Sequence, residues 1–181
     1  MIPNTDLLFD EDHLQDVALR VGSLITADAE IKRHDQPLTV VGVLDGALFW
    51  MADLLRAMPV GTRYGFVRAK SYVGEQVTKL HTKTLVDPAL IKGRHVIVAE
   101  DIVDTGETIR AIRVLLLSLG AESIRVAAMI DKPGRRLPEN VNIEPTWIGM
   151  TVEPDTFVVG HGLDYTDGDG RNLRGVFKVR R

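Results

Sequence analysis

The stretch His95–Ile112, HVIVAEDIVDTGETIRAI, decides the fold that we expect for this chain. Its apolar start, His95–Ala99, predicts a buried strand. Two adjacent acids, Glu100 and Asp101, follow that run. A helical pattern comes next, with one apolar face formed by Ile109, Ile112, Leu115, Leu116 and Leu119. The stretch therefore predicts acids at the carboxyl end of a strand, and a Thr-Gly turn that opens a helix.

The turn between this strand and this helix suits a phosphorylated ligand. The N–H groups of a first helical turn have no partners within the helix, and the helix dipole favours negative charge there. Gly106 lets the backbone approach a phosphate closely, while Thr105 and Thr108 add hydroxyl donors. Glu100 and Asp101 would repel an anion unless they accept hydrogen bonds from sugar hydroxyls or hold hydrated Mg²⁺, a cation that prefers oxygen ligands.

Asp104 follows this acidic pair and can exchange a proton with a bound ligand. A plainer alternative is a buried strand that ends in an ordinary helix N-cap, with Asp104 or Thr105 as the capping residue. A cap accounts for one acid but not for three. The ligand site is therefore the favoured interpretation.

The segment Val98–Thr108, VAEDIVDTGET, resembles the phosphoribosyl pyrophosphate (PRPP) motif of the type I phosphoribosyltransferases. That motif is an apolar strand, two acids, two apolar residues and Asp-Thr-Gly-x-Thr. The resemblance implies an α/β fold: a mostly parallel twisted sheet flanked by helices, with a small hood and a mobile loop. It assigns PRPP binding to Glu100, Asp101, Asp104, Thr105, Gly106, Glu107 and Thr108.

Alternating strand and helix patterns along the chain also predict a parallel α/β sheet. A helix capped by Asp10 or Asp12 is expected to run to about His34, and a second helix to cover residues 47–58. Further strands are expected at 38–44, 63–73, 82–86, 123–130, 146–150, 156–159 and 176–179, with a polar loop at 74–81. Residues 1–181 are expected to form one domain, with a core at about 36–150 and a hood from the N-terminal segment and about 151–181.

Composition excludes several classes of protein. A net charge of −3 and a pI of about 5.9 argue against a constitutive nucleic-acid binder, which usually has a basic surplus. The absence of cysteine excludes disulfides and thiolate chemistry. The N-terminal sequence is acidic and lacks the pattern of a signal peptide, and no apolar run approaches a membrane span. We therefore expect a cytoplasmic protein without a membrane partner.

A second group of residues fits a purine base. Lys132 closes a strand and can donate to a 6-oxo group, and Phe157 can stack on a ring. A site built on such a hydrogen bond rejects a 6-amino analogue well. These residues, with Leu163-Asp164-Tyr165, resemble the hypoxanthine-guanine phosphoribosyltransferase family, where corresponding segments form the purine site. The resemblance assigns purine binding to Lys132, Phe157, Val158 and Asp164.

Three further segments match that family. Val43–Ala47, VLDGA, resembles its pyrophosphate loop, which often contains a cis peptide before the residue that precedes the glycine. Arg68–Tyr72, RAKSY, resembles the start of its mobile loop, which assigns Lys70, Ser71 and Tyr72 to that loop. Pyrophosphate binding falls to Asp45, Gly46 and Arg171. Asp45 is acidic where the family commonly has a basic residue, so we expect backbone N–H groups to bind there while the carboxylate points away.

The resemblance implies purine salvage: Mg²⁺-dependent transfer of the 5-phosphoribosyl group from PRPP to hypoxanthine or guanine, giving IMP or GMP and pyrophosphate. It places Glu100 and Asp101 near one Mg²⁺, Asp164 near a second Mg²⁺ through water, and Asp104 near purine N7 as the proton acceptor. The family implies a homodimer or homotetramer. Two alternatives stay open: a xanthine-preferring phosphoribosyltransferase, and a PRPP-sensing regulator on the same fold that binds nucleic acid. The regulator would need a basic face, which the acidic balance disfavours.

Overall fold

A six-stranded sheet forms the centre of the part of the chain that the computed structural model describes, which is residues 4–28, 31, 37–59, 61–73, 78–166 and 168–180. All neighbouring pairs are parallel except the edge pair of β3 and β4. In spatial order the strands are β4 (Thr78–Thr84), β3 (Arg63–Val73), β2 (Thr39–Leu44), β5 (His95–Val103), β6 (Ser123–Asp131) and β7 (Trp147–Thr151).

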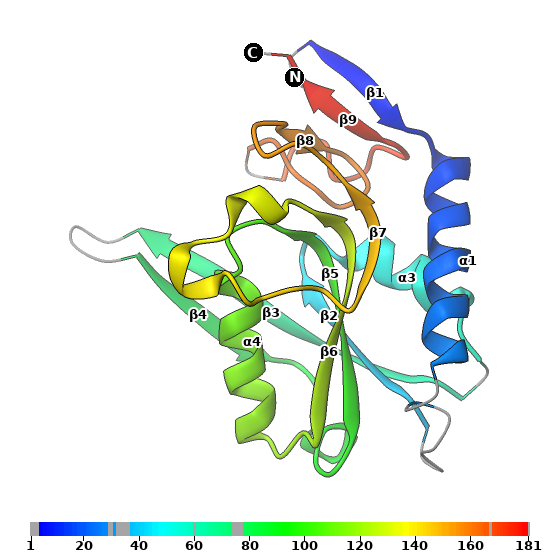
Figure 1. Cartoon of the computed structure of the whole chain (residues 1–181), viewed down its shortest axis with the longest axis vertical. Helices are drawn as coiled ribbons and strands as arrows, with labels where there is room; N and C mark the ends of the chain where they lie inside the picture. The colour runs from blue at the N-terminus through cyan, green and yellow to red at the C-terminus, as the bar shows by residue number, and fades with distance from the viewer. Residues whose placement is uncertain are drawn as a thin grey trace.

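Helices cover both faces of this sheet (Figure 1). On one face lie α1 (Glu11–Ala27) and α3 (Leu48–Arg56), and on the other lies α4 (Glu107–Ser118). Short 3-10 turns connect the elements at Pro88–Leu90, Pro133–Arg135 and Pro138–Asn140.

Alternation along β5 divides the core between these two faces. Ile97 and Ala99 pack into the cluster that contains the α1 and α3 side chains, whereas Val96 and Val98 pack into the cluster with α4. A strand that is buried on both faces has a continuous run of apolar residues, as β5 has at Val96–Ala99.

A second, smaller sheet forms the hood. Its strands are β1 (Thr5–Phe9), β9 (Val176–Val179) and β8 (Val158–Val159), which pair antiparallel in the order β1-β9-β8. Figure 1 shows this sheet beyond the central sheet, with β1 and β9 side by side. The mostly parallel sheet, its flanking helices and this hood confirm the predicted fold class.

The strand order reverses between β2 and β5. From β2 the chain moves outward to β3 and β4, and it then returns to β5 on the other side of β2. In open α/β sheets, ligands bind beyond the carboxyl ends of the strands at such a switch point. Asp45 and Gly46 follow β2, and Glu100 and Asp101 lie near the end of β5. The topology thus gathers two of the predicted motifs at one edge.

Asp10 caps α1 as predicted, because its carboxylate accepts the His13 N–H at 2.9 Å. The predicted end of this helix near residue 34 is wrong, since α1 ends at Ala27. Asp28 leaves the helical conformation, accepts the Ile31 N–H at 3.3 Å and pairs with Arg125 at 3.0 Å. A short acidic side chain that bonds to the nearby backbone in this way competes with continuation of the helix.

Three strand limits also differ from the predictions. The loop predicted at 74–81 is wrong for residues 78–81, which pair with β3; an edge strand can be polar, because it needs no apolar partner on both sides. Strand β5 continues through its acids to Val103, because Ile102 and Val103 pair with β6. Strand β1 was not predicted; it depends on pairing with β9, from the other end of the chain.

Replacement of Trp50 by alanine should lower the free energy of unfolding by about 3–5 kcal/mol. The indole is 1% exposed and its Nε1 donates to the Ala127 carbonyl at 3.1 Å, so truncation opens a cavity and leaves that acceptor without its donor. Urea denaturation of the two proteins measures the change. Leu117→Ala, at a site 57% exposed on α4, is the control and should stay within about 0.5 kcal/mol. A loss below about 1 kcal/mol for Trp50→Ala would contradict this packing.

Candidate active site

Two carboxylates lie side by side near the carboxyl end of β5. Glu100 is buried, and its Oε2 has no hydrogen-bond partner among the described residues. Burial raises the pKa of Glu100 well above its usual range, and the neighbouring Asp101 charge raises it further. Burial also raises the pKa of Asp101 to about 6, although its Oδ1 accepts the Ile102 N–H at 2.8 Å. A divalent cation here would lower both pKa values, so this pair fits a hard metal ion.

The loop after β2 lies directly against this acidic pair. A Cβ atom on Gly46 would stand 1.7 Å from Asp101 Oδ2, so only glycine allows this approach. Gly162 of the hood, at φ +103°, approaches Gly46 equally closely, because its Cβ would lie 1.9 Å from the Gly46 carbonyl oxygen. The peptide bond between Leu44 and Asp45 is cis, as the resemblance implied. Segments from β2, β5 and the hood therefore meet at one point.

Arg171 brings a cation to this meeting point. Its Nη1 donates to the Gly162 carbonyl at 2.5 Å, and its Nη2 pairs with Asp164 Oδ1 at 2.9 Å. Its positive charge also acts to lower the pKa of Asp101. The structure therefore brings together Arg171, Gly46 and Asp101, which the sequence placed in one pyrophosphate and metal region.

The carboxylates that we expected near a metal do not form one cluster. Among the described residues, no three acidic, histidine or cysteine side chains are grouped closely enough to hold an ion. Asp164 is instead engaged by Arg171 and by the Gly168 N–H, at 3.3 Å from its Oδ2. This arrangement leaves Glu100 and Asp101 as the pair whose burial and raised pKa values favour a cation.

The turn that precedes α4 has the form expected for an anion site. Gly106 occupies the N-cap position, at φ +84°, and has no side chain to cap the first turn. The N-cap position is therefore neither Asp104 nor Thr105, although the Thr105 hydroxyl accepts the Glu107 N–H at 3.5 Å. A Cβ on Gly106 would stand 2.9 Å from Asn140 Cβ, so the turn packs closely on the segment after β6. The Glu107 N–H reaches Thr105 Oγ1 only at 3.5 Å, so a bound phosphate could take this N–H together with that of Thr108.

Two arginines that sequence reasoning did not assign support this turn. Arg136 Nη1 donates to the carbonyl oxygens of Val103 at 2.8 Å, Asp104 at 2.6 Å and Lys132 at 3.1 Å. Its Nη2 pairs with buried Asp131. The Arg136 guanidinium therefore ties the end of β5 to the end of β6. The available sequence signal was the basic pair Arg135-Arg136, three residues after the lysine at the end of this strand.

The second of these arginines contacts the predicted proton acceptor. Arg135 Nε lies 3.1 Å from Asp104 Oδ1, and both side chains are partly exposed. Asn140 completes the support, because its Nδ2 donates to the Thr105 carbonyl at 3.0 Å. Residues that follow β6 thus hold the Asp104 side chain and the backbone of the turn at 104–108, which we call the phosphate turn.

The predicted purine residues lie at the end of β6, at the start of β8 and in the loop that follows β8. Lys132 is buried and its Nζ donates to the Thr156 carbonyl at 2.6 Å. Phe157, which follows Thr156 in the chain, is 37% exposed. Tyr165 packs edge-on against it, with ring centroids 5.9 Å apart. Val158 has its side chain in the core, so only its backbone could contact a base. The side chains of Lys70, Ser71 and Tyr72 lie outside the described residues.

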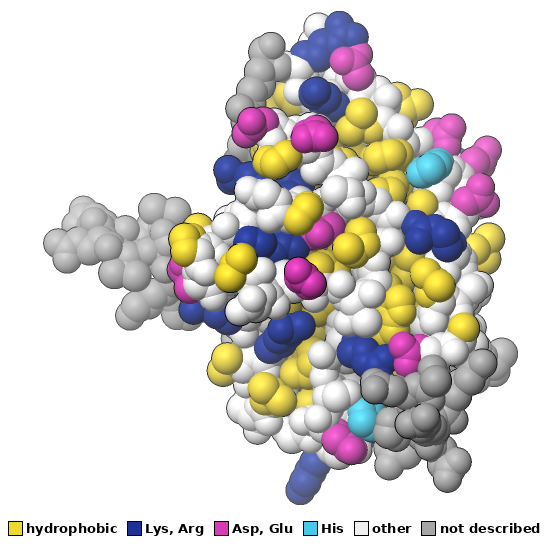
Figure 2. Space-filling view, viewed as in Figure 1, with side chains coloured by type: hydrophobic (Ala, Val, Ile, Leu, Met, Phe, Trp, Pro, Cys, Tyr) yellow, Lys and Arg dark blue, Asp and Glu magenta, His cyan; other side chains and the backbone are white. Residues whose placement is uncertain are grey.

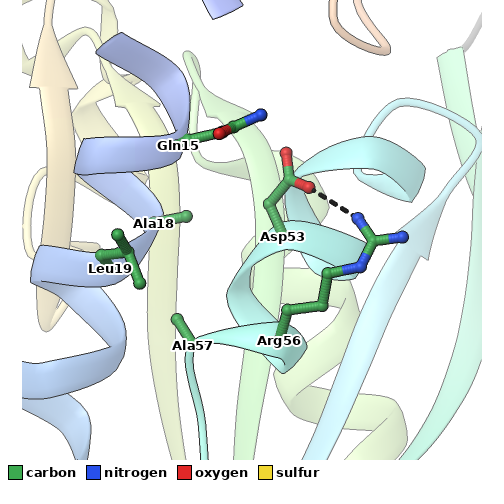
Figure 3. A pocket seen from close by; sticks show the side chains of 6 residues that line it. All are labelled: Gln15, Ala18, Leu19, Asp53, Arg56 and Ala57. Carbon is green, nitrogen blue, oxygen red and sulfur yellow. Dashed lines mark hydrogen bonds and ion pairs between the residues drawn. The ribbon is translucent and has the colours of Figure 1, made fainter. Parts of the chain in front are cut away.

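A hollow elsewhere on the molecule does not coincide with these residues. Figure 3 shows it between α1 and α3; it has a volume of about 240 Å³, and its lining residues are Gln15, Ala18, Leu19, Asp53, Arg56 and Ala57. Figure 2 shows that, on the face in view, cationic side chains are scattered among acidic and hydrophobic ones. Within the described part of the chain, no helix has the length and apolar character needed to cross a membrane.

Comparison with known proteins decides the family. The sequence-family model described as the phosphoribosyl transferase domain matches residues 18–165 of this chain. The chain belongs to the phosphoribosyltransferase family. This confirms the enzyme class predicted from the PRPP motif.

Relatives within that family carry more specific names. A hypoxanthine-guanine phosphoribosyltransferase of Staphylococcus epidermidis is 35% identical over 163 residues, 90% of this chain and 87% of the relative. A hypoxanthine phosphoribosyltransferase of Haemophilus influenzae is 36% identical over 180 residues, 97% and 96% of the two chains. The crystal structure of a hypoxanthine phosphoribosyltransferase from Staphylococcus aureus superposes with a TM-score of 0.83 at 30% identity, covering 97% and 91%. These similarities confirm the resemblance that the sequence indicated.

The raised pKa values of this phosphoribosyltransferase predict how its metal-free stability depends on pH. Between about pH 4 and 6 the folded chain holds a proton on Asp101 that the unfolded chain releases, so stability falls as pH rises through this window. Asp101→Asn removes the buried charge and should stabilise the chain at pH 8 by about 1–2 kcal/mol, after allowance for partial exposure, and by little at pH 4.

Thermal denaturation with a chelator at pH 4 and pH 8 measures this difference. The exposed Asp155→Asn is the matched control, and its effect should not change between the two pH values. An Asp101→Asn effect of equal size at both pH values would show that the carboxylate does not carry a raised pKa.

Proposed function

We propose that this chain transfers the 5-phosphoribosyl group of PRPP to hypoxanthine or guanine, giving IMP or GMP and pyrophosphate. The observation that carries the proposal is that Asp101 on β5, next to Glu100, meets Gly46 and Arg171, and that this strand leads into the glycine turn before α4. This arrangement supplies backbone donors and a cation for phosphate groups, and carboxylates for ribose hydroxyls or metal. The names of the relatives support purine salvage.

The phosphate turn has a positioning role in this reaction. The N–H groups of Gly106, Glu107 and Thr108, with the hydroxyls of Thr105 and Thr108, bind the 5′-phosphate at the start of α4. This contact fixes the ribose so that its C1 faces the base. Holding the two reactants in this orientation lowers the entropic cost of bringing them together.

We assign the metal and pyrophosphate contacts to the acidic pair and to the residues that meet it. Glu100 and Asp101 would hold one Mg²⁺, and Asp164 would lie near a second, through water. When bound, these ions would neutralise charge on the leaving pyrophosphate. The N–H groups of Asp45 and Gly46 and the Arg171 guanidinium bind that pyrophosphate.

The base contacts follow from the residues at the ends of β6 and β8. An ammonium has three N–H donors, so the bond from Lys132 to the Thr156 carbonyl is compatible with a second bond to the base oxygen. Phe157 stacks on the purine, and Asp104 accepts the proton at N7 as the new bond forms at N9. We assign loop closure over the reaction to Lys70, Ser71 and Tyr72, and we expect a single-domain cytoplasmic homodimer or homotetramer.

A spectrophotometric assay of the purified chain tests this proposal. The substrates are PRPP and Mg²⁺ with each of hypoxanthine, guanine, xanthine and adenine. We expect turnover of the first two bases, little of adenine, and no turnover without a divalent metal. Preference for xanthine would replace the proposal with the xanthine-specific alternative. No turnover of any base, together with salt-dependent binding of RNA, would favour the regulator.

A further inference from the structure

The pyrophosphate loop contains an ion pair that the proposed function does not use. Asp45 Oδ1 lies 2.5 Å from Arg68 Nη2, and each side chain is a little over 40% exposed. Asp45 belongs to the loop after β2, and Arg68 lies on β3. The acidic residue of this loop is therefore matched by a cation from the neighbouring strand.

Arg68 stands at the same edge of the sheet as the acidic pair. In the parallel register of β2 and β3 it is the partner of Leu44, the last residue of β2. Gly46, two residues further along, lies against Asp101. A guanidinium that reaches Asp45 is thus beside the loop that we assign to pyrophosphate.

The hydrogen-bonding capacity of Arg68 is incompletely used. Its Nε is buried and has no hydrogen-bond partner among the described residues. Buried N–H groups in native proteins are nearly always paired, so an unpaired one calls for an explanation. A ligand with two acceptor oxygens could take this N–H and an adjacent Nη N–H together, which is how arginine commonly binds phosphate.

A second cation lies beside Arg68. Lys83 of β4 is directly opposite Arg68 in the antiparallel register, so the two side chains emerge on the same face of the sheet. Like charges in such a pair repel each other unless an anion lies nearby. Asp45 supplies one negative charge, and a polyphosphate would supply more.

We propose that Arg68 binds the pyrophosphate group of PRPP, and that Asp45 holds its guanidinium in place until pyrophosphate displaces the carboxylate. This inference rests on the proposed function and adds a residue to it. Exchange is feasible because an exposed ion pair is weak, and the released Asp45 carboxylate reaches solvent. Asp45 then lowers the affinity of the site for pyrophosphate, because its carboxylate competes with the leaving group for Arg68. This competition favours release of pyrophosphate.

A double-mutant cycle tests the proposal by calorimetric titration of Mg²⁺-pyrophosphate into the chain, its Arg68→Gln and Asp45→Asn variants, and the double variant. We expect Arg68→Gln to weaken pyrophosphate binding by about 10- to 100-fold, as for loss of a charge-assisted hydrogen bond. Asp45→Asn should tighten it by several-fold when Arg68 is present, and by less than twofold when Arg68 is absent. That dependence on Arg68 separates competition for its guanidinium from simple repulsion by Asp45.

The matched control is Arg56→Gln, which breaks the exposed Arg56–Asp53 pair on α3, 3.1 Å long and drawn in Figure 3. It should leave pyrophosphate affinity unchanged, and titration with IMP reports whether each variant is folded. Pyrophosphate affinity within twofold of the parent for Arg68→Gln overturns the inference, as does equal tightening by Asp45→Asn with and without Arg68. If either of these results occurs but the parent chain converts the base normally, only the inference fails and the proposed function still holds. If the parent chain binds neither pyrophosphate nor base, both the inference and the proposed function are wrong.

Discussion

Replacement of Asp104 by asparagine is expected to lower kcat for hypoxanthine and guanine by about 100- to 10 000-fold, the usual contribution of general acid-base catalysis. An amide of nearly the same shape cannot accept the N7 proton. The backbone of the phosphate turn should not move, because Arg136 holds the Asp104 carbonyl and Asn140 holds that of Thr105. The Kd for PRPP should therefore change by less than about threefold, since binding and proton transfer use different atoms.

Arg135→Gln provides the matched control for this experiment. It breaks the same 3.1 Å ion pair but leaves the Asp104 carboxylate in place. Because exposed ion pairs contribute little to stability, turnover should stay within about threefold of the parent. Steady-state kinetics and titration with PRPP measure the two parameters for each variant. Unchanged turnover in Asp104→Asn would remove this residue from proton transfer, and an equal loss in both variants would assign the effect to the ion pair.

Lys132→Gln should lower kcat/KM for hypoxanthine by about 10- to 100-fold, because a hydrogen bond from a charged donor contributes about 1.5–3 kcal/mol. Adenine has no 6-oxo group, so its small kcat/KM should change little and the discrimination between the bases should narrow. The side chain is buried at the end of β6, 24 positions before its partner Thr156. Its loss therefore also tests whether the end of β6 is the purine side of the site.

Competition between bases, followed by separation of the nucleotide products, measures this change in specificity directly. Titration with PRPP checks that the variant is folded and that the phosphate turn is intact. The exposed Lys92→Gln is a control at a site distant from the purine residues, and it should leave the ratio unchanged. If the ratio of the nucleotide products from hypoxanthine and adenine is the same in Lys132→Gln as in the parent, a group other than Lys132 recognises the 6-position of the base.

The junction of β5 and α4 could be predicted because all its parts are local. The apolar run, the two acids, the glycine turn and the helical face follow one another along the chain, so short-range patterns suffice. The start of α1 was predictable for the same reason, since Asp10 reaches only three residues ahead. The predicted helix face is likewise buried at Ile109, Ile112 and Leu116.

Contacts between distant segments could not be predicted in this way. Asp45 and Arg68 are 23 positions apart, and Asp104 and Arg135 are 31 positions apart, so no local pattern indicates that they meet. Strand β1 forms only by pairing with β9, near the other terminus. The approach of Gly162 to Gly46 depends on where the hood lies over the central sheet. These features follow from the assembled fold and not from any short segment.

A crystal structure of the chain with PRPP and Mg²⁺ is the most direct measurement of the central claim. We expect the 5′-phosphate on the N–H groups at the start of α4, the ribose hydroxyls against Glu100 and Asp101, and the pyrophosphate beside Gly46 and Arg171. PRPP bound away from the carboxyl ends of β2 and β5 would contradict the account.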